Sequence, residues 1–492
     1  MNRFVFYATS GLFCLFFIFC VQPAIAQQAP EEAPGIGGEM TLADCIRVAM
    51  KENKTIKSAY LDRVVQKYSL SVAEDKFTPK MTLSTGANYA ETSIRDSDTI
   101  GATVTDVSAT VSELLPSGAA LELTANQGTV NGDTTSGTDV NYGWNVSLTQ
   151  PLLKGGGFDV TSASVRSARL SELNNVLSLK TTLIDTLTTV ITTYRDYVRA
   201  LKELDISRQS FERGKELVEI NKELIAAGRM AKIDIVQSEA DVANREYSLL
   251  SSENGADAAR LALVKAMGID RKAQITPIGT FDIEPIPYEL TQAKSIAFEN
   301  RPDYRSALLN MEDSQISLML SKNDQLWDLS LTGDYGQNFI RPGGLGVNSD
   351  TDAWAVGLNL SIPIGDMTIY QSYLNAKTSQ QQLDLSLTKL KDDIEIEVED
   401  VLRDADMKMR QVKLAQLARE LSEKKVEIET EKLKMGRSTN FQLVSFQNDL
   451  VNAQNNELNS IISYLNALTD IERTLGITLD RWGVALVERQ GE

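Results

Sequence analysis

The most constraining feature of the sequence is a repeat whose two copies lie 208 positions apart (436 minus 228). In the first copy a helical pattern stops at Gly228 and resumes within a few residues, and Gly436 divides the second copy in the same way. Further matches run colinearly over about a hundred positions: Ala168 and Ala376, Glu212 and Glu420, Arg229 and Arg437, Asp241 and Asp449, and Gly268 and Gly476. Such a series indicates a duplicated unit.

The first 26 residues have the features of a secretory signal peptide. A basic residue precedes an apolar run at positions 4–21, and an Ala-Ile-Ala cleavage site occupies positions 24–26. The run is close to the length of a membrane span, so an uncleaved anchor is the alternative interpretation. Residues 27–40 then form a linker rich in Pro, Gly and Glu.

The composition argues against several classes of function. The 492-residue chain has no histidine, and its formal net charge is −18. Loss of the signal peptide removes Cys14 and Cys20 and leaves only Cys45, which is too few for an internal disulfide. Zinc sites, histidine-based catalysis and a nucleic-acid partner are therefore not expected. We predict no catalytic residue, no cofactor and no metal site.

Beyond the signal peptide, no stretch approaches 18 apolar residues. A mature chain that enters a membrane is therefore expected to do so as a β-barrel.

Helical and strand-like periodicities alternate along the first repeat, residues 41–270. The helical pattern covers 41–77, 161–227 and 232–267, and two-residue alternation marks strands at 81–89, 103–111, 121–126 and 144–151. The helix at 161–227 would be on the order of 100 Å long, which indicates a coiled-coil assembly. The two shorter helices together match its length, so we expect them to lie end to end alongside it.

The second repeat, residues 290–478, follows a connector at 271–289 and has the same plan. We expect helices at 290–325, 367–435 and 440–475, strands at 329–335 and 354–363, and a Gly-rich loop at 341–346. Residues 479–492 form a C-terminal tail. The fold class is thus mixed α and β.

The order of these features resembles the TolC-like outer membrane efflux protein family over essentially all of the mature chain. The resemblance rests on the two-part helical plan, the paired Gly-Arg turns and three short motifs, Leu148-x-Gln150-Pro151-Leu152, Leu360-x-Ile362-Pro363-Ile364 and Glu299-Asn300-Arg301-Pro302-Asp303. It implies a homotrimer in which strands of three protomers close one transmembrane β-barrel in outer-membrane lipid, while the helices form a coiled-coil barrel across the periplasm.

The resemblance also implies where partners bind. The family's periplasmic turns meet a membrane-fusion adaptor, which connects the duct to an inner-membrane pump. In this sequence the matching residues are Gly228, Arg229, Met230, Gly436, Arg437 and Ser438. The implied function is a passive exit duct for small molecules. Two alternatives remain open: a duct for type I protein secretion, and a periplasmic spacer or adhesin that does not conduct.

The sequence departs from the family pattern at the expected gate. Relatives close the tunnel with aspartate rings six and nine residues after the second turn glycine, where this chain has Gln442 and Ser445. Asp234 in the first repeat does match a gate carboxylate, although an aspartate is also favourable near any helix start.

Four other features each permit two interpretations. The hairpin at 103–126 exceeds the family's usual two strands in this half, and it either widens the barrel or projects from it. The acidic run at 392–400 either lines the tunnel or forms a solvated helix face. Tryptophans at strand starts belong to a membrane-interface girdle or to a core, and the arginines beside the turn glycines bind a partner or cap carbonyl groups. These residues are Trp144, Trp327, Trp354, Arg229 and Arg437.

Overall fold

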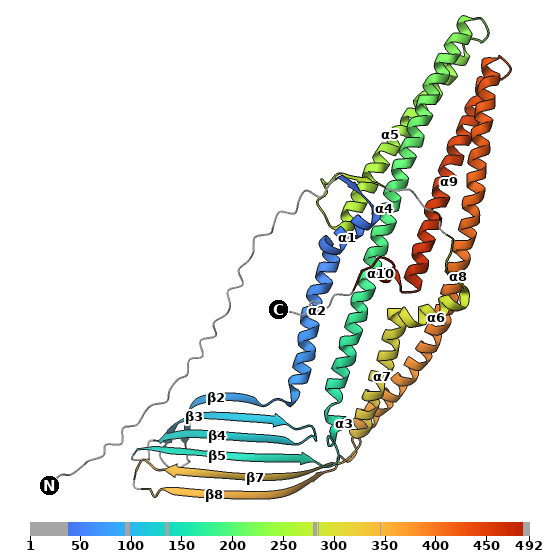
Figure 1. Ribbon diagram of the computed structural model, residues 1–492. Coiled ribbons are helices and arrows are strands. Elements are labelled where there is room, and N and C mark those ends of the chain that lie inside the picture. The colour runs from blue at the N-terminus through green and yellow to red at the C-terminus, as the bar shows by residue number, and fades with distance from the viewer. Residues whose placement is uncertain are drawn as a thin grey trace.

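The computed structural model describes residues 38–93, 99–132, 137–278, 283, 285–344 and 346–485. The expected signal peptide lies outside the described residues. One end of the molecule is a β-sheet, and long helices lead from it to two helical turns at the opposite end (Figure 1). The predicted combination of long helices and antiparallel strands is confirmed.

One helical hairpin from each repeat forms the long body of the molecule (Figure 1). A long helix turns back into a helix of about half its length, and a further short helix packs on the part of the long helix near the sheet. The predicted pairing of two short helices with one long helix is therefore confirmed in both repeats. The first repeat has α4 (Ala163–Ala226), α5 (Asp234–Met267) and α2 (Lys54–Glu74), and the second has α8 (Met367–Lys434), α9 (Asn440–Thr474) and α7 (Pro302–Asn323).

The two helices predicted at 41–77 and 290–325 are each broken, so the expectation of continuous helices was wrong. In the first, α1 (Leu42–Glu52) ends at Asn53, whose side-chain Oδ1 accepts hydrogen bonds from the N–H groups of Thr55 and Ile56 at the start of α2. In the second, α6 (Leu290–Asn300) ends at an extended Arg301, because Pro302 disfavours a helical conformation in the residue before it.

Six antiparallel strands form one sheet in the order β2-β3-β4-β5-β7-β8. The hairpin expected at 103–126 thus lies inside the sheet as β3 and β4, between β2 and β5. The strands are β2 (Lys80–Ser93), β3 (Thr99–Leu114), β4 (Ala120–Gly132), β5 (Thr138–Pro151), β7 (Asp328–Arg341) and β8 (Ser349–Ser361).

The register gives this sheet one apolar and one polar face, because directly opposed residues of antiparallel strands share a face. The apolar face carries, on successive strands, Leu83, Val107, Leu123, Leu148, Leu331 and Leu358. The polar face carries Ser84, Ser108, Thr124, Ser147, Thr332 and Asn359 on the same six strands. The leucines and valine of the apolar set are all at least 43% exposed in the single chain.

A small parallel sheet connects the start of the first repeat to the connector between the repeats. Its strands are β1 (Gly38–Met40), at the end of the expected linker, and β6 (Ile275–Pro277). Both lie in a core formed by α1, α4 and α5, against which Leu479 and Trp482 of the C-terminal tail also pack. Among the described residues, no helix combines the length and hydrophobicity that a membrane crossing requires.

Candidate functional site

Both turns at the end of the molecule far from the sheet have the same backbone hydrogen bonds. Gly228 and Gly436 have φ values of +69° and +71°, in the left-handed region that favours glycine. In the first turn, Gly228 N donates to Ile225 O and Arg229 N to Leu224 O, at 2.9 and 2.8 Å. The corresponding bonds occur at Gly436 and Arg437, so both long helices end in a Schellman motif.

The surroundings of these turn glycines are open. A Cβ on Gly228 would meet no atom within 4 Å, and a Cβ on Gly436 would meet only the flexible guanidinium of Arg229, at 3.0 Å. Arg229 and Arg437 are exposed, whereas Met230 packs on a small apolar cluster that includes Leu217 and Leu433. Each turn thus presents glycine and arginine to solvent.

The other two repeated glycines are packed against backbone. Gly268 and Gly476 end α5 and α9 with φ values of +77° and +73°. A Cβ on Gly268 would lie 2.8 Å from Asn53 Cα, and one on Gly476 would lie 2.8 Å from Asn300 O. Gly268 therefore allows the end of α5 to lie close to the break between α1 and α2, and Gly476 allows the end of α9 to lie close to the break between α6 and α7.

A buried carboxylate supports the second turn. Ser438 Oγ donates to Glu429 Oε1 at 2.6 Å, and Lys432 Nζ donates to Glu429 Oε2 at 3.1 Å. The hydrogen bonds from Ser438 and Lys432 lower the pKa of Glu429. In the first repeat the equivalent position, 208 residues earlier, is Asn221, so at this position the second turn has a titratable group and the first has a neutral amide.

The candidate gate residues lie just beyond the turns, one at the start of α5 and two near the start of α9. Asp234 begins α5 and is partly buried, and its backbone carbonyl accepts a hydrogen bond from Ser238 Oγ. Gln442 and Ser445 are exposed on the first turns of α9. Their role as a gate stays a prediction.

A buried cluster of small polar side chains joins the two repeats beside these positions. Asn221 Nδ2 donates to Ser238 Oγ at 2.6 Å and to Asn440 Oδ1 at 3.1 Å, and Asn440 Nδ2 donates to Ser238 Oγ at 2.8 Å. Their residues are at most 5% exposed and come from α4, α5 and α9. We call Asn221, Ser238 and Asn440 the amide latch.

An arginine forms a second polar link between the repeats, closer to the middle of α5. Arg245 donates to Gln447 Oε1 of α9 at 3.0 Å, to Ser210 O of α4 at 2.9 Å and to Asp241 Oδ2 at 2.6 Å. Its side chain packs over Gly214, where a Cβ would lie 2.9 Å from Arg245 Cδ. The sequence analysis did not identify this link or the amide latch; polar residues at core positions of an apolar helical stripe are the signal that points to them.

The acidic run on α8 is partly ion-paired. Arg301, at the break between α6 and α7, donates to Glu397 Oε2 at 2.7 Å and to Thr474 O at 3.1 Å. Lys294 of α6 lies 2.8 Å from Glu395. These contacts assign two of its carboxylates to holding α6 against α8.

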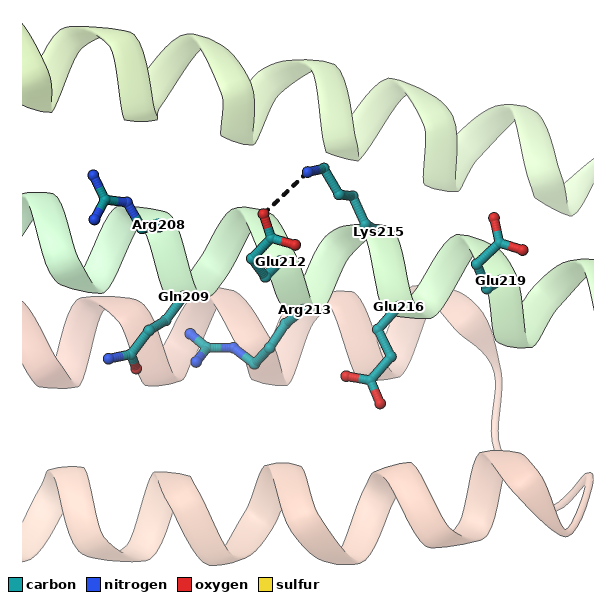
Figure 2. Close-up of a pocket in the computed structure, with 7 residues that line it drawn as sticks. All are labelled: Arg208, Gln209, Glu212, Arg213, Lys215, Glu216 and Glu219. Atoms are coloured by element: carbon teal, nitrogen blue, oxygen red, sulfur yellow. Dashed lines mark hydrogen bonds and ion pairs between the residues drawn. The ribbon is translucent and has the colours of Figure 1, made fainter.

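An open groove of about 870 Å³ follows the surface of α4. In Figure 2, Gln209, Arg213 and Glu216 point to one side of the helix, and Arg208 and Lys215 point to the other. The three cationic side chains are balanced by three glutamates, so the groove has no net charge that would favour an ionic ligand. Its lining is Arg208, Gln209, Glu212, Arg213, Lys215, Glu216 and Glu219. Within the described part of the chain, no group of three or more His, Cys, Asp or Glu side chains could hold a metal ion.

The fold is that of solved outer-membrane channels. The Campylobacter jejuni CmeC outer membrane channel aligns with a TM-score of 0.68 and 18% identity, over 88% of this chain and 85% of that one. VceC from Vibrio cholerae aligns with a TM-score of 0.66 and 15% identity, over 88% and 96%. The open state of the Neisseria gonorrhoeae MtrE outer membrane channel aligns with a TM-score of 0.63 and 16% identity, over 89% of each chain.

The sequence itself gives a family assignment. No curated protein matches it. A family model described as outer membrane efflux protein matches residues 45–269, which include the first tip turn, and the internal repeat extends the same plan to the second. Residues 45–269 thus match the outer membrane efflux protein family, and over most of its length the chain has the fold of outer-membrane channels.

Proposed function

We propose that this chain is one protomer of a homotrimeric exit duct for small molecules in the cell outer membrane. The sheet spans the membrane, the helices extend into the periplasm, and the two turns contact a periplasmic adaptor that leads to an inner-membrane pump. One observation carries this proposal: a two-faced sheet and a pair of exposed, repeat-related turns lie at opposite ends of the same long helices.

The apolar face supports insertion of the sheet in lipid. On this face, Tyr142 stacks on Phe339 at 5.0 Å, toward the ends of the strands far from the helices. Trp144 lies edge-on to Tyr335 at 5.4 Å near the middle of β5 and β7, not at the start of a strand as the sequence predicted. Trp354 shares the face and is 78% exposed. Aromatic girdles beside an apolar band are characteristic of outer-membrane barrels, so we favour the girdle interpretation over core packing for Trp354.

The open edges of the sheet support assembly. Six strands are fewer than the eight of the smallest membrane-spanning barrels, so one protomer cannot close a barrel. Strands β2 and β8 each leave an edge that another copy can pair with. Three copies, the number that the family resemblance implies, close both the sheet and the helical layer.

The turns support the adaptor contact. Glycine and arginine form the solvent-facing surface of both turns, and Met230 adds an apolar side chain at the first. We assign Gly228, Arg229, Met230, Gly436, Arg437 and Ser438 to adaptor docking. We place the gate at Asp234, Gln442 and Ser445, with the amide latch controlling the separation of α9 from α4 and α5.

Conductance in planar lipid bilayers tests the duct. Purified trimer should form discrete channels, and a well-folded trimer that forms none would favour the spacer or adhesin. Export assays in cells then separate small molecules from protein cargo. A strain lacking the protein should accumulate a small toxic compound, and recovery of protein secretion alone on complementation would favour the type I secretion duct.

A further inference from the structure

Strands β3 and β4 have the topology of a hairpin inserted into a smaller sheet. Both lie between β2 and β5, and each is paired antiparallel along nearly its whole length. Because the insert contains two strands, removing it would leave β2 antiparallel to β5. A four-stranded sheet β2-β5-β7-β8 would then retain every remaining strand direction.

The hairpin has the same two faces as the rest of the sheet. Leu123 of β4 opposes Val111 of β3 on one side and Val146 of β5 on the other, all on the apolar face. On the polar face, Thr110 and Thr124 are directly opposed, and their hydroxyl groups are 3.1 Å apart. A hairpin that projected into water would gain nothing from this continuous segregation of side chains.

The turn between β3 and β4 is fixed to the junction of sheet and helices. Ser117 O accepts a hydrogen bond from Gly157 N at 3.0 Å, and Ser117 Oγ donates to Gln150 Oε1 at 3.0 Å. Ala119 in the same turn is only 3% exposed. These contacts hold the hairpin in the plane of the sheet at its helical end.

We propose that β3 and β4 are wall strands of the membrane barrel, which therefore has eighteen strands in the trimer, six from each protomer. This inference rests on the proposed trimeric duct and specifies its outlet. Barrel diameter grows nearly linearly with strand number, so the outlet is about one and a half times as wide as the twelve-stranded barrel that four strands per protomer would give. Barrels of this size hold an aqueous channel, so the outlet admits wider solutes.

The strand directions permit this closure. Each strand in the sheet runs opposite to its neighbours, so the first and last of six, β2 and β8, run in opposite directions. β8 of one protomer can therefore pair antiparallel with β2 of the next. The two edge strands have similar lengths, 14 and 13 residues. Adding a single strand would break this alternation, whereas adding a hairpin preserves it.

Cysteine labelling of trimer in lipid vesicles tests the proposal. We would place single cysteines on the two faces of the hairpin, as Val107→Cys and Leu123→Cys on the apolar face and Ser108→Cys and Thr124→Cys on the polar face. Val146→Cys and Ser147→Cys in β5 are matched controls in a strand outside the insert. The natural Cys45 is fully buried, and burial raises the pKa of its thiol to about 12, so it should not react.

A bulky, charged maleimide should label the two polar-face variants of the hairpin as fast as Ser147→Cys, and label Val107→Cys and Leu123→Cys at least tenfold more slowly. Equal labelling of both hairpin faces, with the contrast retained in β5, would place the hairpin outside the wall and overturn this inference alone. Slow labelling of both hairpin faces would do the same. Loss of the contrast in β5 would remove the whole sheet from the membrane and contradict the proposed duct as well.

An electron-microscopy reconstruction of the same trimer provides an independent count. Eighteen strands around the barrel are expected. A closed barrel of twelve strands, with β3 and β4 outside it, would overturn the inference while leaving the trimeric duct intact.

Discussion

Asn221 and Asn440, which lie 219 positions apart in the chain, share a direct side-chain hydrogen bond of 3.1 Å in a buried layer of the helices. Ser238 completes this layer by accepting from both amides. The contact joins α4 and α5 of the first repeat to α9 of the second, close to both turns. Because neutral amides make the link, it does not depend on pH over the physiological range.

Asn221→Ala should loosen this end of the molecule. The substitution removes the donor to Ser238 and Asn440 and leaves a buried carbonyl oxygen without that partner, at a cost of about 1–3 kcal/mol. If the latch holds the duct closed, single-channel recordings should show a larger open fraction at the same trimer yield. Asn244→Ala, at an exposed position of α5, is the matched control and should leave the open fraction unchanged. An unchanged open fraction in Asn221→Ala would remove the latch from gating.

The four repeated glycines should divide into two classes. Gly228→Leu adds a side chain in open space, and Gly436→Leu adds one that displaces only the flexible guanidinium of Arg229. The left-handed backbone costs each variant about 1–2 kcal/mol, so trimer yield should stay nearly unchanged while export is lost. Gly268→Leu and Gly476→Leu place Cβ within 2.8 Å of backbone atoms and should lower the yield of folded protein.

Growth in the presence of a toxic compound, set beside outer-membrane trimer levels, measures both effects. Turn variants that export normally would exclude these glycines from adaptor docking. The same conclusion follows if export falls only in proportion to the amount of trimer.

Acidification should loosen the second turn selectively. The pKa of Glu429 is lowered in the folded protein by Ser438 and Lys432, so its stabilising contribution is present above the ordinary value of 4.5 and is lost as pH falls through the folded-state value. The first turn has Asn221 at the equivalent position and provides an internal control.

The measurement is the rate of amide hydrogen exchange at Gly436–Asn440, corrected for intrinsic rates and divided by the rate at the first turn. This ratio should increase when the pH is lowered from 6 to 3.5. Glu429→Gln should abolish this difference between the two pH values. A ratio that changes equally in wild type and Glu429→Gln would assign the effect to another group.

The polar face of the sheet should favour cations. Among the described strand residues it carries five carboxylates but only one lysine, Lys80, which lies 3.6 Å from Asp75. Three of the carboxylates, Asp106, Glu122 and Asp334, lie within the strands rather than at their ends. Neutralising them together as Asp106→Asn, Glu122→Gln and Asp334→Asn should lower the cation-to-anion permeability ratio severalfold.

Reversal potentials in a salt gradient measure this ratio. Glu113→Gln, on the apolar face of β3, is the control and should leave it unchanged. A triple variant that retains the wild-type ratio would place the selectivity elsewhere in the duct.

The sequence predicted the features that depend on local periodicity. Helical and two-residue patterns lie within single segments, so the long helices, their turns and the strands could be located, and the repeat related them. Both breaks in the short helices were missed. Asparagine is found at helix caps and also inside helices, so Asn53 gave no clear signal, whereas Pro302 is a signal for the second break that the prediction did not use.

Contacts between distant segments could not be predicted in the same way. The place of β3 and β4 depends on pairing with β2 and β5, and the amide latch depends on how α4 is rotated against α9. Neither strand pairing nor helix rotation is encoded in the pattern of one segment alone. The gate positions Gln442 and Ser445 were chosen from the spacing in the family and are exposed, whereas the buried polar contacts on the same helix lie at Asn440 and Gln447.

The Schellman turns also constrain how the two repeats can change in length. α4 ends at Ala226 and α8 ends at Lys434, again 208 positions apart. α8 is 68 residues long and α4 is 64, so this difference in length lies at the ends of the two helices near the sheet. One residue added to only one long helix would raise its turn by about 1.5 Å and rotate it by about 100°. A partner that contacts both turns would then meet surfaces at different heights and orientations. Insertions in the helical body should therefore be tolerated only when both repeats lengthen together.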